Sequence, residues 1–149
     1  MPFQIRAAQK DDEDDWRRLW DQYNEFLKRT ISEEVTSTTF ARMLDNGCRM
    51  YCSLAINEND QIVGFVHWLP QLSTFSVEET IYLHDMFVDP SSQGGGTGRR
   101  LIEHVYEQAK IMNAKSVYWH TQWFNHRAQI LYVKMADRTD NVHYRKTFF

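Results

Sequence analysis

The chain of 149 residues is 42% hydrophobic and 25% charged, and its formal net charge at pH 7 is −3. This length fits one domain spanning residues 1–149, and the slightly acidic balance argues against a dedicated nucleic-acid-binding protein. No stretch approaches the roughly 18 apolar residues that a membrane span needs, and the N-terminus lacks the basic and apolar regions of a signal peptide.

The first half of the chain combines short alternating segments with two helical patterns. The expected elements are a strand over residues 3–8, helices over 11–27 and 32–47, and strands over 50–56 and 61–69. Ser32 is the expected N-cap of the second helix and Gly47 its end. The first helix carries apolar residues at helical spacing, and these predict a buried stripe. The stripe consists of Trp16, Leu19, Trp20, Tyr23, Phe26 and Leu27.

The second half predicts strand–helix–strand units. The expected elements are a strand over residues 80–88, a helix over 97–113, a strand over 116–122, a helix over 126–136 and a last strand over 141–148. The first of these helices has a buried stripe made of Leu101, Ile102, Val105, Tyr106, Ala109 and Met112. The order β-α-α-β-β-β-α-β-α-β predicts a mixed α+β or α/β domain.

Four of the chain's six glycines lie within five positions, in the segment QGGGTG at residues 93–98. Glycine clusters where the backbone needs positive φ angles or where a ligand approaches the main chain closely. A glycine-rich turn from a strand into a helix offers free N–H groups to phosphate oxygens. The two common nucleotide patterns do not fit, because Arg99 stands where each would require another residue.

Three separated segments resemble the GNAT superfamily of N-acetyltransferases. The loop follows that family's pattern of Arg or Gln, two residues, Gly, one residue and Gly or Ala, with Gln93, Gly96 and Gly98 in these places. NHRAQILYVKM is similar to the family's Asn-x-x-Ala-x-x-Leu-Tyr-x-Lys segment. The matching residues are Asn125, Ala128, Leu131, Tyr132 and Lys134.

The third of these segments and one further region narrow the resemblance. YLHDMFV resembles the Tyr-Leu-Glu-Asp strand of spermidine/spermine-type acetyltransferases, with His84 in place of the Glu. Residues 25–45 are similar to the subgroup that contains fungal histone and D-amino-acid acetyltransferases. Ala136 stands where the family usually has a glycine, which leaves the last turn open.

The resemblance implies the GNAT acyl-CoA N-acyltransferase fold, a central mixed β-sheet with helices on both faces, and acetyl-CoA as acetyl donor. Backbone N–H groups of the glycine loop would hold the pyrophosphate, aided by the helix dipole. Arg99 or Arg100 would meet a phosphate or remain solvated, and Asn125 would contact the cosubstrate or only cap its helix. The implied cofactor-binding residues are Met86, Phe87, Val88, Gln93, Gly94, Gly95, Gly96, Thr97, Gly98, Arg99, Asn125 and Tyr132.

Acetyl transfer to an amine needs a base and an acid, because an amine with a pKa near 10.4 is protonated at pH 7. By its place in the motif, Tyr132 is the expected general acid toward the departing thiolate. His84 is the first candidate for the base, ahead of Asp85 and His120. In a regular strand Asp85 would point to the opposite face from His84. Asp85 would otherwise hold the substrate ammonium or satisfy backbone groups.

We expect the acceptor to be a small primary amine, a polyamine or an amino acid. The alternatives are a histone or protein lysine acetyltransferase, a catalytically silent acyl-CoA sensor, and a partner-binding domain without a CoA site. The acidic surface favours a cationic acceptor. Trp16, Trp20 and Tyr23 lie near the region that shapes the acceptor site in this fold, although a core stripe explains them better.

The resemblance also implies a homodimer, in which residues 141–149 supply the pairing strand. The two cysteines, Cys48 and Cys52, form no metal-ligand set. We therefore expect no metal site, reduced thiols and a cytoplasmic location.

Overall fold

A computed structural model describes residues 2–149, and their helices and strands follow the expected order as far as the fourth helix. The strands are β1 (Gln4–Ala7), β2 (Tyr51–Ile56), β3 (Ile62–Gln71), β4 (Thr80–Val88) and β5 (Val117–Tyr118). The helices are α1 (Glu13–Phe26), α2 (Glu33–Leu44), α3 (Thr97–Ile111) and α4 (His126–Met135).

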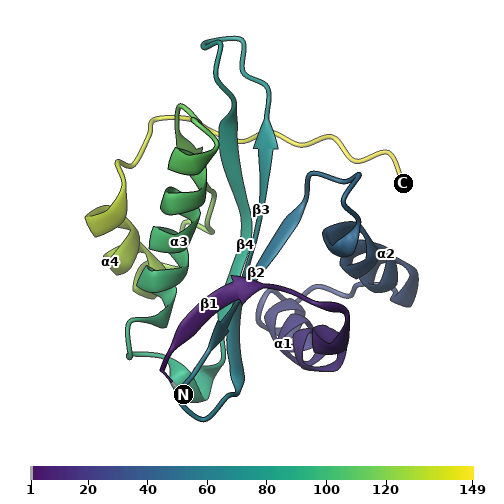
Figure 1. The fold of residues 1–149 in the computed structure, drawn as a ribbon. Coiled ribbons are helices and arrows are strands. Elements are labelled where there is room, and N and C mark those ends of the chain that lie inside the picture. The colour runs from purple at the N-terminus through teal and green to yellow at the C-terminus, as the bar shows by residue number, and fades with distance from the viewer. Residues whose placement is uncertain (1) are drawn as a thin grey trace.

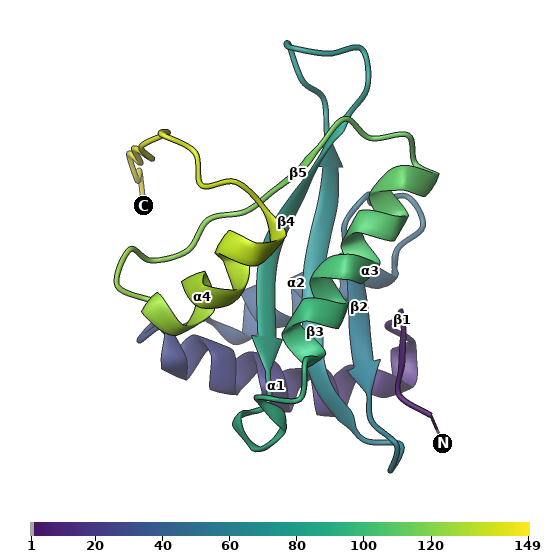
Figure 2. The same ribbon diagram turned by 90° about the vertical axis from the view of Figure 1, so that its left-hand side faces the viewer.

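The sheet has the strand order β1-β2-β3-β4-β5, with neighbours antiparallel except for the parallel pair β4 and β5. Helices α1 and α2 lie against one face and α3 and α4 against the other (Figures 1 and 2). The expected fold, a central mixed sheet covered by helices on both faces, is therefore confirmed.

Each face of the sheet has its own hydrophobic core. The core on the α1 and α2 side contains Trp16, Leu19, Trp20, Phe40, Met43, Cys52, Leu54, Ile56, Ile62 and Phe65. The core on the α3 side contains Ala55, Val63, Val66, Trp68, Ile81, Leu83, Leu101, Ile102, Val105 and Ala109. Most of both predicted stripes is thus buried, but Phe26 is 61% exposed and Met112 lies beyond the end of α3 with 36% exposure.

The start of α2 agrees with the prediction and its end does not. The Ser32 side chain accepts a hydrogen bond from the Val35 N–H and so caps the helix. The helix ends at Leu44, and the C-cap is Asp45 in an extended conformation. Gly47 is therefore not the C-cap. Instead, the N–H of Gly47 donates a hydrogen bond to the Asp45 carboxylate at 2.8 Å.

Strand β4 contains a bulge at His84. In the pairing with β3, Trp68 lies opposite Leu83 and His67 lies opposite Asp85, so His84 has no partner residue. Leu83 packs in the core on the α3 side, and so does Met86. The two residues between them consequently share the other face, which is turned toward α1.

Strands β4 and β5 pair only at Ile81–Val117 and Tyr82–Tyr118. The prediction of a strand over residues 116–122 was therefore too long, because β5 diverges from its only neighbour after Tyr118. The divergence leaves the second half of β4 without a strand on that side.

The predicted strand over residues 141–148 is wrong, since residues 137–149 form no helix or strand. A strand needs a neighbour for its N–H and C=O groups, and no strand of the described chain pairs with this segment. The segment contacts the domain where His143 stacks on His120, with ring centroids 5.2 Å apart.

Candidate active site

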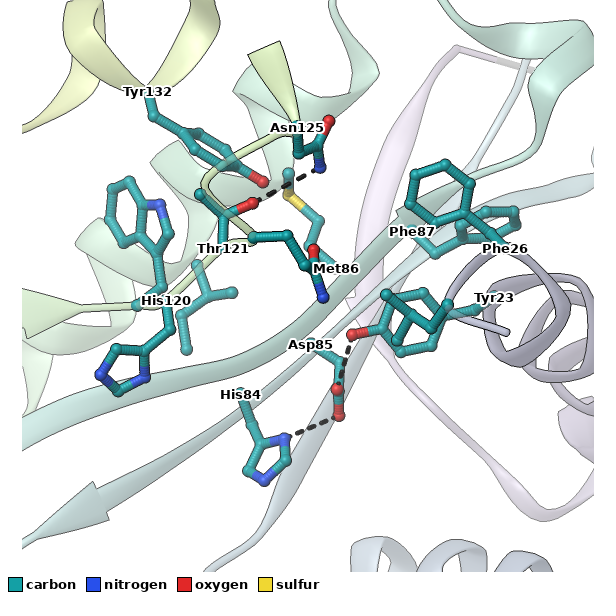
Figure 3. A pocket seen from close by; sticks show the side chains of 14 residues that line it. Tyr23, Phe26, His84, Asp85, Met86, Phe87, His120, Thr121, Asn125 and Tyr132 are labelled. Carbon is teal, nitrogen blue, oxygen red and sulfur yellow. Dashed lines mark hydrogen bonds and ion pairs between the residues drawn. The ribbon is translucent and has the colours of Figure 1, made fainter. Parts of the chain in front are cut away.

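A cavity of about 100 Å³ lies where β4 and β5 diverge, beneath α4 and beside the end of α1 (Figure 3). Its lining includes many of the residues that the sequence singled out for the site, together with Phe26: Tyr23, His84, Asp85, Met86, Phe87, His120, Asn125 and Tyr132. A second cavity of about 600 Å³ adjoins it. The two cavities share Phe26, Leu27, Gln122 and Asn125.

Asp85 lies at the centre of a buried hydrogen-bond network and is only 8% exposed. Its Oδ1 accepts a hydrogen bond from the Tyr23 hydroxyl at 2.8 Å. Its Oδ2 contacts Nδ1 of His67 at 2.9 Å and Nδ1 of His84 at 3.0 Å. The expectation that Asp85 would point away from His84 assumed a regular strand and is corrected by the bulge, which places both side chains on one face.

The contacts of Asp85 keep it ionised. Burial alone would raise its pKa, but the hydrogen bonds to His67 and His84 outweigh burial and hold the pKa of Asp85 well below its usual range. The pKa of the Tyr23 phenol is shifted the other way, because burial and the neighbouring carboxylate both raise it. Asp85 is thus a fixed anion with its donors in place, which suits an orienting group rather than a proton acceptor.

His84 projects into the cavity with about half of its side chain exposed. The hydrogen bond to Asp85 raises the pKa of His84 above its ordinary value, although desolvation opposes the shift. A carboxylate can only accept, so Nδ1 of His84 donates to it. When the imidazole is neutral, the free lone pair is on Nε2, which points away from Asp85 (Figure 3).

His67 is the residue that the sequence reasoning missed. It lies on β3, is 3% exposed, and receives a hydrogen bond at Nε2 from the indole N–H of Trp16 at 3.0 Å. An indole N–H can only donate, so the ring proton of His67 is on Nδ1 and is directed at Asp85. Trp16 and His67 together fix the carboxylate that orients His84. A histidine in the segment GFVHWL was the available signal, but only the sheet register reveals its partner.

His120, the third candidate base, lies apart from this network. Its Nδ1 is 3.4 Å from the Tyr82 hydroxyl, and its ring stacks on His143. Burial, followed by the charges of His143 and His84, lowers the pKa of His120. It lines the cavity but has no carboxylate to orient it among the described residues.

Two residues of the α4 region line the cavity: Tyr132 lies within the helix, and Asn125 precedes its first turn. Burial raises the pKa of Tyr132, and its hydroxyl, directed toward β4 in Figure 3, has no hydrogen-bond partner within residues 2–149. Asn125 is the N-cap of α4, where its Oδ1 accepts from the Ala128 N–H at 3.4 Å. Its Nδ2 also donates to the Thr121 hydroxyl. Asn125 therefore caps a helix and lines the cavity at once.

The glycine loop joins β4 to α3 with the backbone conformations that glycine allows. Gly94 and Gly96 have φ angles of +89° and +82°, and no atom lies within 4 Å of where their Cβ atoms would stand. The first helical hydrogen bond of this turn runs from the Arg100 N–H to the Gly96 carbonyl. The N–H groups of the first helical turn before Arg100 are consequently free, as at any helix start. This open, N–H-lined turn fits a pyrophosphate.

The remaining predicted residues lie around this turn. Gln93 fastens it to the strand by donating to the Val88 carbonyl at 3.2 Å. Arg99 forms an exposed ion pair with Glu103 at 3.0 Å, an interaction weak enough for a phosphate to replace. Met86, Phe87 and Val88 are half-buried on the part of β4 that has lost β5. Thr97 is buried.

Residues 2–149 contain no group of three or more histidine, cysteine or acidic side chains arranged to hold a metal ion. None of the helices in the same range has the length and hydropathy to cross a membrane.

Comparison with known proteins gives a consistent result. Residues 7–136 match the model of the acetyltransferase (GNAT) family. The chain is 40% identical over 143 residues to the D-amino-acid N-acetyltransferase HPA3 of Saccharomyces cerevisiae, covering 95% of this chain and 89% of that protein. It is 28% identical to YhfO of Bacillus subtilis, an uncharacterised N-acetyltransferase, with 94% of each chain covered.

The fold agrees as well. A crystal structure of a probable acetyltransferase superposes with a TM-score of 0.83 at 22% identity, covering 97% of this chain and 96% of that one.

Proposed function

Because the chain belongs to the acetyltransferase (GNAT) family, and is therefore an acyltransferase enzyme, we propose that it moves the acetyl group of acetyl-CoA directly to a primary amine of a small molecule. Acetyltransferases of this family use acetyl-CoA as cosubstrate. The observation that carries the proposal is that the hydrogen-bonded pair of His84 and Asp85 lines the same cavity as Tyr132, on the strand that leads into the glycine loop.

In this proposal His84 is the general base. Nε2 accepts a proton from the substrate ammonium, directly or through one water, and Asp85 stabilises the imidazolium that results. Orientation of a histidine by a buried carboxylate through Nδ1–H is a recurrent arrangement in acid–base catalysis. Asp85, His67 and Trp16 act as positioning residues.

Tyr132 is the proposed general acid. The neutral amine attacks the thioester carbonyl, so that an N–C bond forms and the C–S bond breaks. The nitrogen, positively charged after the attack, loses its second proton to solvent, and solvent in turn reprotonates the phenolate that Tyr132 leaves. The departing sulfur gains the proton of the Tyr132 hydroxyl, which burial keeps protonated at neutral pH.

The cosubstrate is proposed to follow β4 into the glycine loop. Backbone groups of Met86, Phe87 and Val88 would contact the pantetheine arm, since β4 has no strand neighbour there. The pyrophosphate would lie on the free N–H groups of the loop, with Gln93 and Arg99 beside it, while Asn125 and Tyr132 would contact the cosubstrate from the cavity. The loop residues are Gly94, Gly95, Gly96, Thr97 and Gly98.

The acceptor class rests on the yeast relative, which is named for acetylation of D-amino acids. A protein lysine acetyltransferase is the second candidate, because the subgroup resemblance extends to fungal histone acetyltransferases. The intact base and acid argue against a silent acyl-CoA sensor, which would not need them.

The first experiment is thiol release from acetyl-CoA with D- and L-amino acids, polyamines and a histone-tail peptide, alongside acetyl-CoA binding by calorimetry. We expect release with one small-amine class and none without an amine. Release with the peptide alone would favour protein acetylation. Binding without release from any acceptor would favour the sensor, and absence of binding would contradict the loop assignment.

We further propose a cytoplasmic homodimer. The location is supported by the two free thiols, Cys48 and Cys52. The dimer is supported by the exposed C-terminal segment, in which Val142, Tyr144 and Phe148 alternate with other residues as on one face of a strand.

A further inference from the structure

Arg29 is fixed in place just beyond the end of α1. Lys28 has a positive φ of 54°, and the N–H groups of Lys28 and Arg29 bond the carbonyls of Glu25 and Asn24, both at 3.0 Å. This pair of hydrogen bonds is the Schellman arrangement that ends helices. The backbone of Arg29 is therefore determined by the helix end and not by a free loop.

The guanidinium of Arg29 is fixed as well. Nε and Nη2 donate to Oδ1 of Asn24 at 2.9 and 2.8 Å. Asn24 is 6% exposed and is itself held by a hydrogen bond to the Trp20 carbonyl. The guanidinium lies over the rings of Trp20 and Tyr23, 5.9 and 5.7 Å from their centroids. A neutral amide and two aromatic faces thus position a full positive charge.

This cation has no anionic partner among residues 2–149. Five other arginines are paired with carboxylates: Arg6, Arg17, Arg18, Arg49 and Arg99. Nη1 of Arg29 makes no hydrogen bond within the described chain. An ordered guanidinium with a free edge is suited to the planar, two-oxygen geometry of a carboxylate.

Arg29 lies next to residues of the site, although its own side chain lines neither cavity. Tyr23, beneath its guanidinium, bonds Asp85 directly, and Phe26 and Leu27 line the cavity. The bulge turns His84 toward this same face. The positive charge of Arg29 is near enough to oppose the upward shift in the pKa of His84.

Among the described residues that line the two cavities, Asp85 is the only carboxylate, and the other charged side chains are positive. The lining of the second cavity includes Lys28 and Arg127 and no acidic residue. In the first cavity the only carboxylate is Asp85, whose oxygens already have three donors. A polyamine would therefore bring further positive charge beside Arg29 with no free anion to receive it. The local field favours an acceptor that carries a carboxylate, contrary to the expectation drawn from the net acidic charge.

Resting on the acetyltransferase activity proposed above, we propose that the acceptor is an amine bearing a carboxylate near its amino group, an amino acid, and that Arg29 binds this carboxylate while His84 faces the amino group. A guanidinium also binds phosphate, so the test separates the carboxylate of the acceptor from the phosphates of acetyl-CoA.

The test compares each acceptor amino acid with its amide and its decarboxylated amine, in wild type, Arg29→Gln, Arg29→Lys and the control Arg42→Gln. Arg42 is exposed on α2 and has no ion pair within the described residues. We expect Arg29→Gln to lower kcat/KM for the amino acid about 10- to 100-fold, the usual cost of a lost charged hydrogen bond. The KM for acetyl-CoA and the rate with the amide should change less than about twofold. Arg29→Lys should recover part of the loss, and Arg42→Gln should match wild type.

An equal loss for the amino acid and its amide would overturn the proposal, as would a wild-type preference for the decarboxylated amine. A rise in the KM for acetyl-CoA alone would assign Arg29 to a phosphate and also overturn it. These outcomes all require measurable thiol release, whereas failure of the proposed activity would appear as no release from any acceptor.

Discussion

The chemistry proposed for this protein depends on how single side chains are oriented, and His84 is the clearest case. Its sequence neighbour Asp85 would lie on the other face of a regular strand. The bulge brings both to one face, and His67 and Tyr23 hold the carboxylate in place. The same histidine without these contacts would be a weakly oriented surface residue.

The rate should therefore depend on pH through His84. A base is active when neutral, so kcat/KM should rise with pH through a pKa above about 6.5, because Asp85 raises the pKa of His84. Asp85→Asn removes this cause and should move the acidic limb to lower pH, because desolvation and the charge of Arg29, which both lower the pKa of His84, remain. His84→Ala should remove the limb. The measurement is a pH–rate profile, and a profile that both variants leave unaltered would assign the base to His120 or to water.

Tyr132 gives a second test at this scale. Tyr132→Phe keeps the ring against Trp119, with centroids 5.4 Å apart in the wild type, and removes only the hydroxyl. If the hydroxyl protonates the leaving thiolate, kcat should fall by about 10²-fold or more, while acetyl-CoA affinity stays close to wild type. Single-turnover kinetics and calorimetry measure the two quantities. Retained turnover would mean that Tyr132 only packs the α4 helix.

At the scale of elements, the site is made by the places where strands and helices end or become irregular. The bulge in β4 directs His84, the divergence of β4 and β5 opens the cavity, and the start of α3 supplies unbonded N–H groups. Regular parts of the sheet instead supply the two hydrophobic cores.

The glycine loop allows a controlled comparison between neighbours. Gly96→Ala forces a side chain into a left-handed conformation at φ +82°, so it should destabilise the fold by about 1–2 kcal/mol. It should also weaken acetyl-CoA binding by distorting the start of α3. Gly95→Ala has no such strain, because Gly95 has no positive φ and its added Cβ would meet only the Ser92 carbonyl at 3.8 Å.

Thermal unfolding and calorimetry on both variants measure these effects. Equal stability of the two variants would show that the left-handed conformation is not required. Unchanged acetyl-CoA affinity in Gly96→Val, which is bulkier, would remove the loop from the binding site.

At the scale of the whole molecule, the C-terminal segment is the part that forms no helix or strand and contacts the domain through the stacking of His143 on His120. Residues 137–149 contain exposed apolar side chains and no secondary structure. The segment has apolar residues spaced as on one face of a strand, but no strand within residues 2–149 pairs with it.

We predict that the full chain is a dimer in light scattering and that removal of residues 141–149 yields a monomer with the same far-ultraviolet circular dichroism. Val142→Asp with Tyr144→Asp should have the same effect, because charges disrupt an apolar strand face. Phe75→Asp, which alters a 98% exposed residue on the β3–β4 connection, is the control and should remain dimeric. A monomeric full chain, or a dimeric truncated chain, would contradict the role of the segment.

The sequence by itself determined the order of elements, the sheet with helices on both faces, and the residues of the glycine loop. Local rules suffice for these features: Ser32 caps α2 because its own hydroxyl reaches the helix start, and Gly96 adopts positive φ because it has no Cβ. Strand β4 was predicted with its observed bounds, since the alternating run TIYLHDMFV is apolar enough to identify it.

Only the tertiary structure decided how these parts meet. The bulge at His84 depends on register with β3, the role of His67 depends on a contact with Trp16 that lies 51 residues away in sequence, and the missing last strand depends on whether a neighbour exists. Likewise, Arg29 is a candidate for binding an anion because no carboxylate of the described residues pairs with it, and this depends on the tertiary structure. Pairing, burial and charge balance are sums over residues distant in the chain, so no local pattern can encode them.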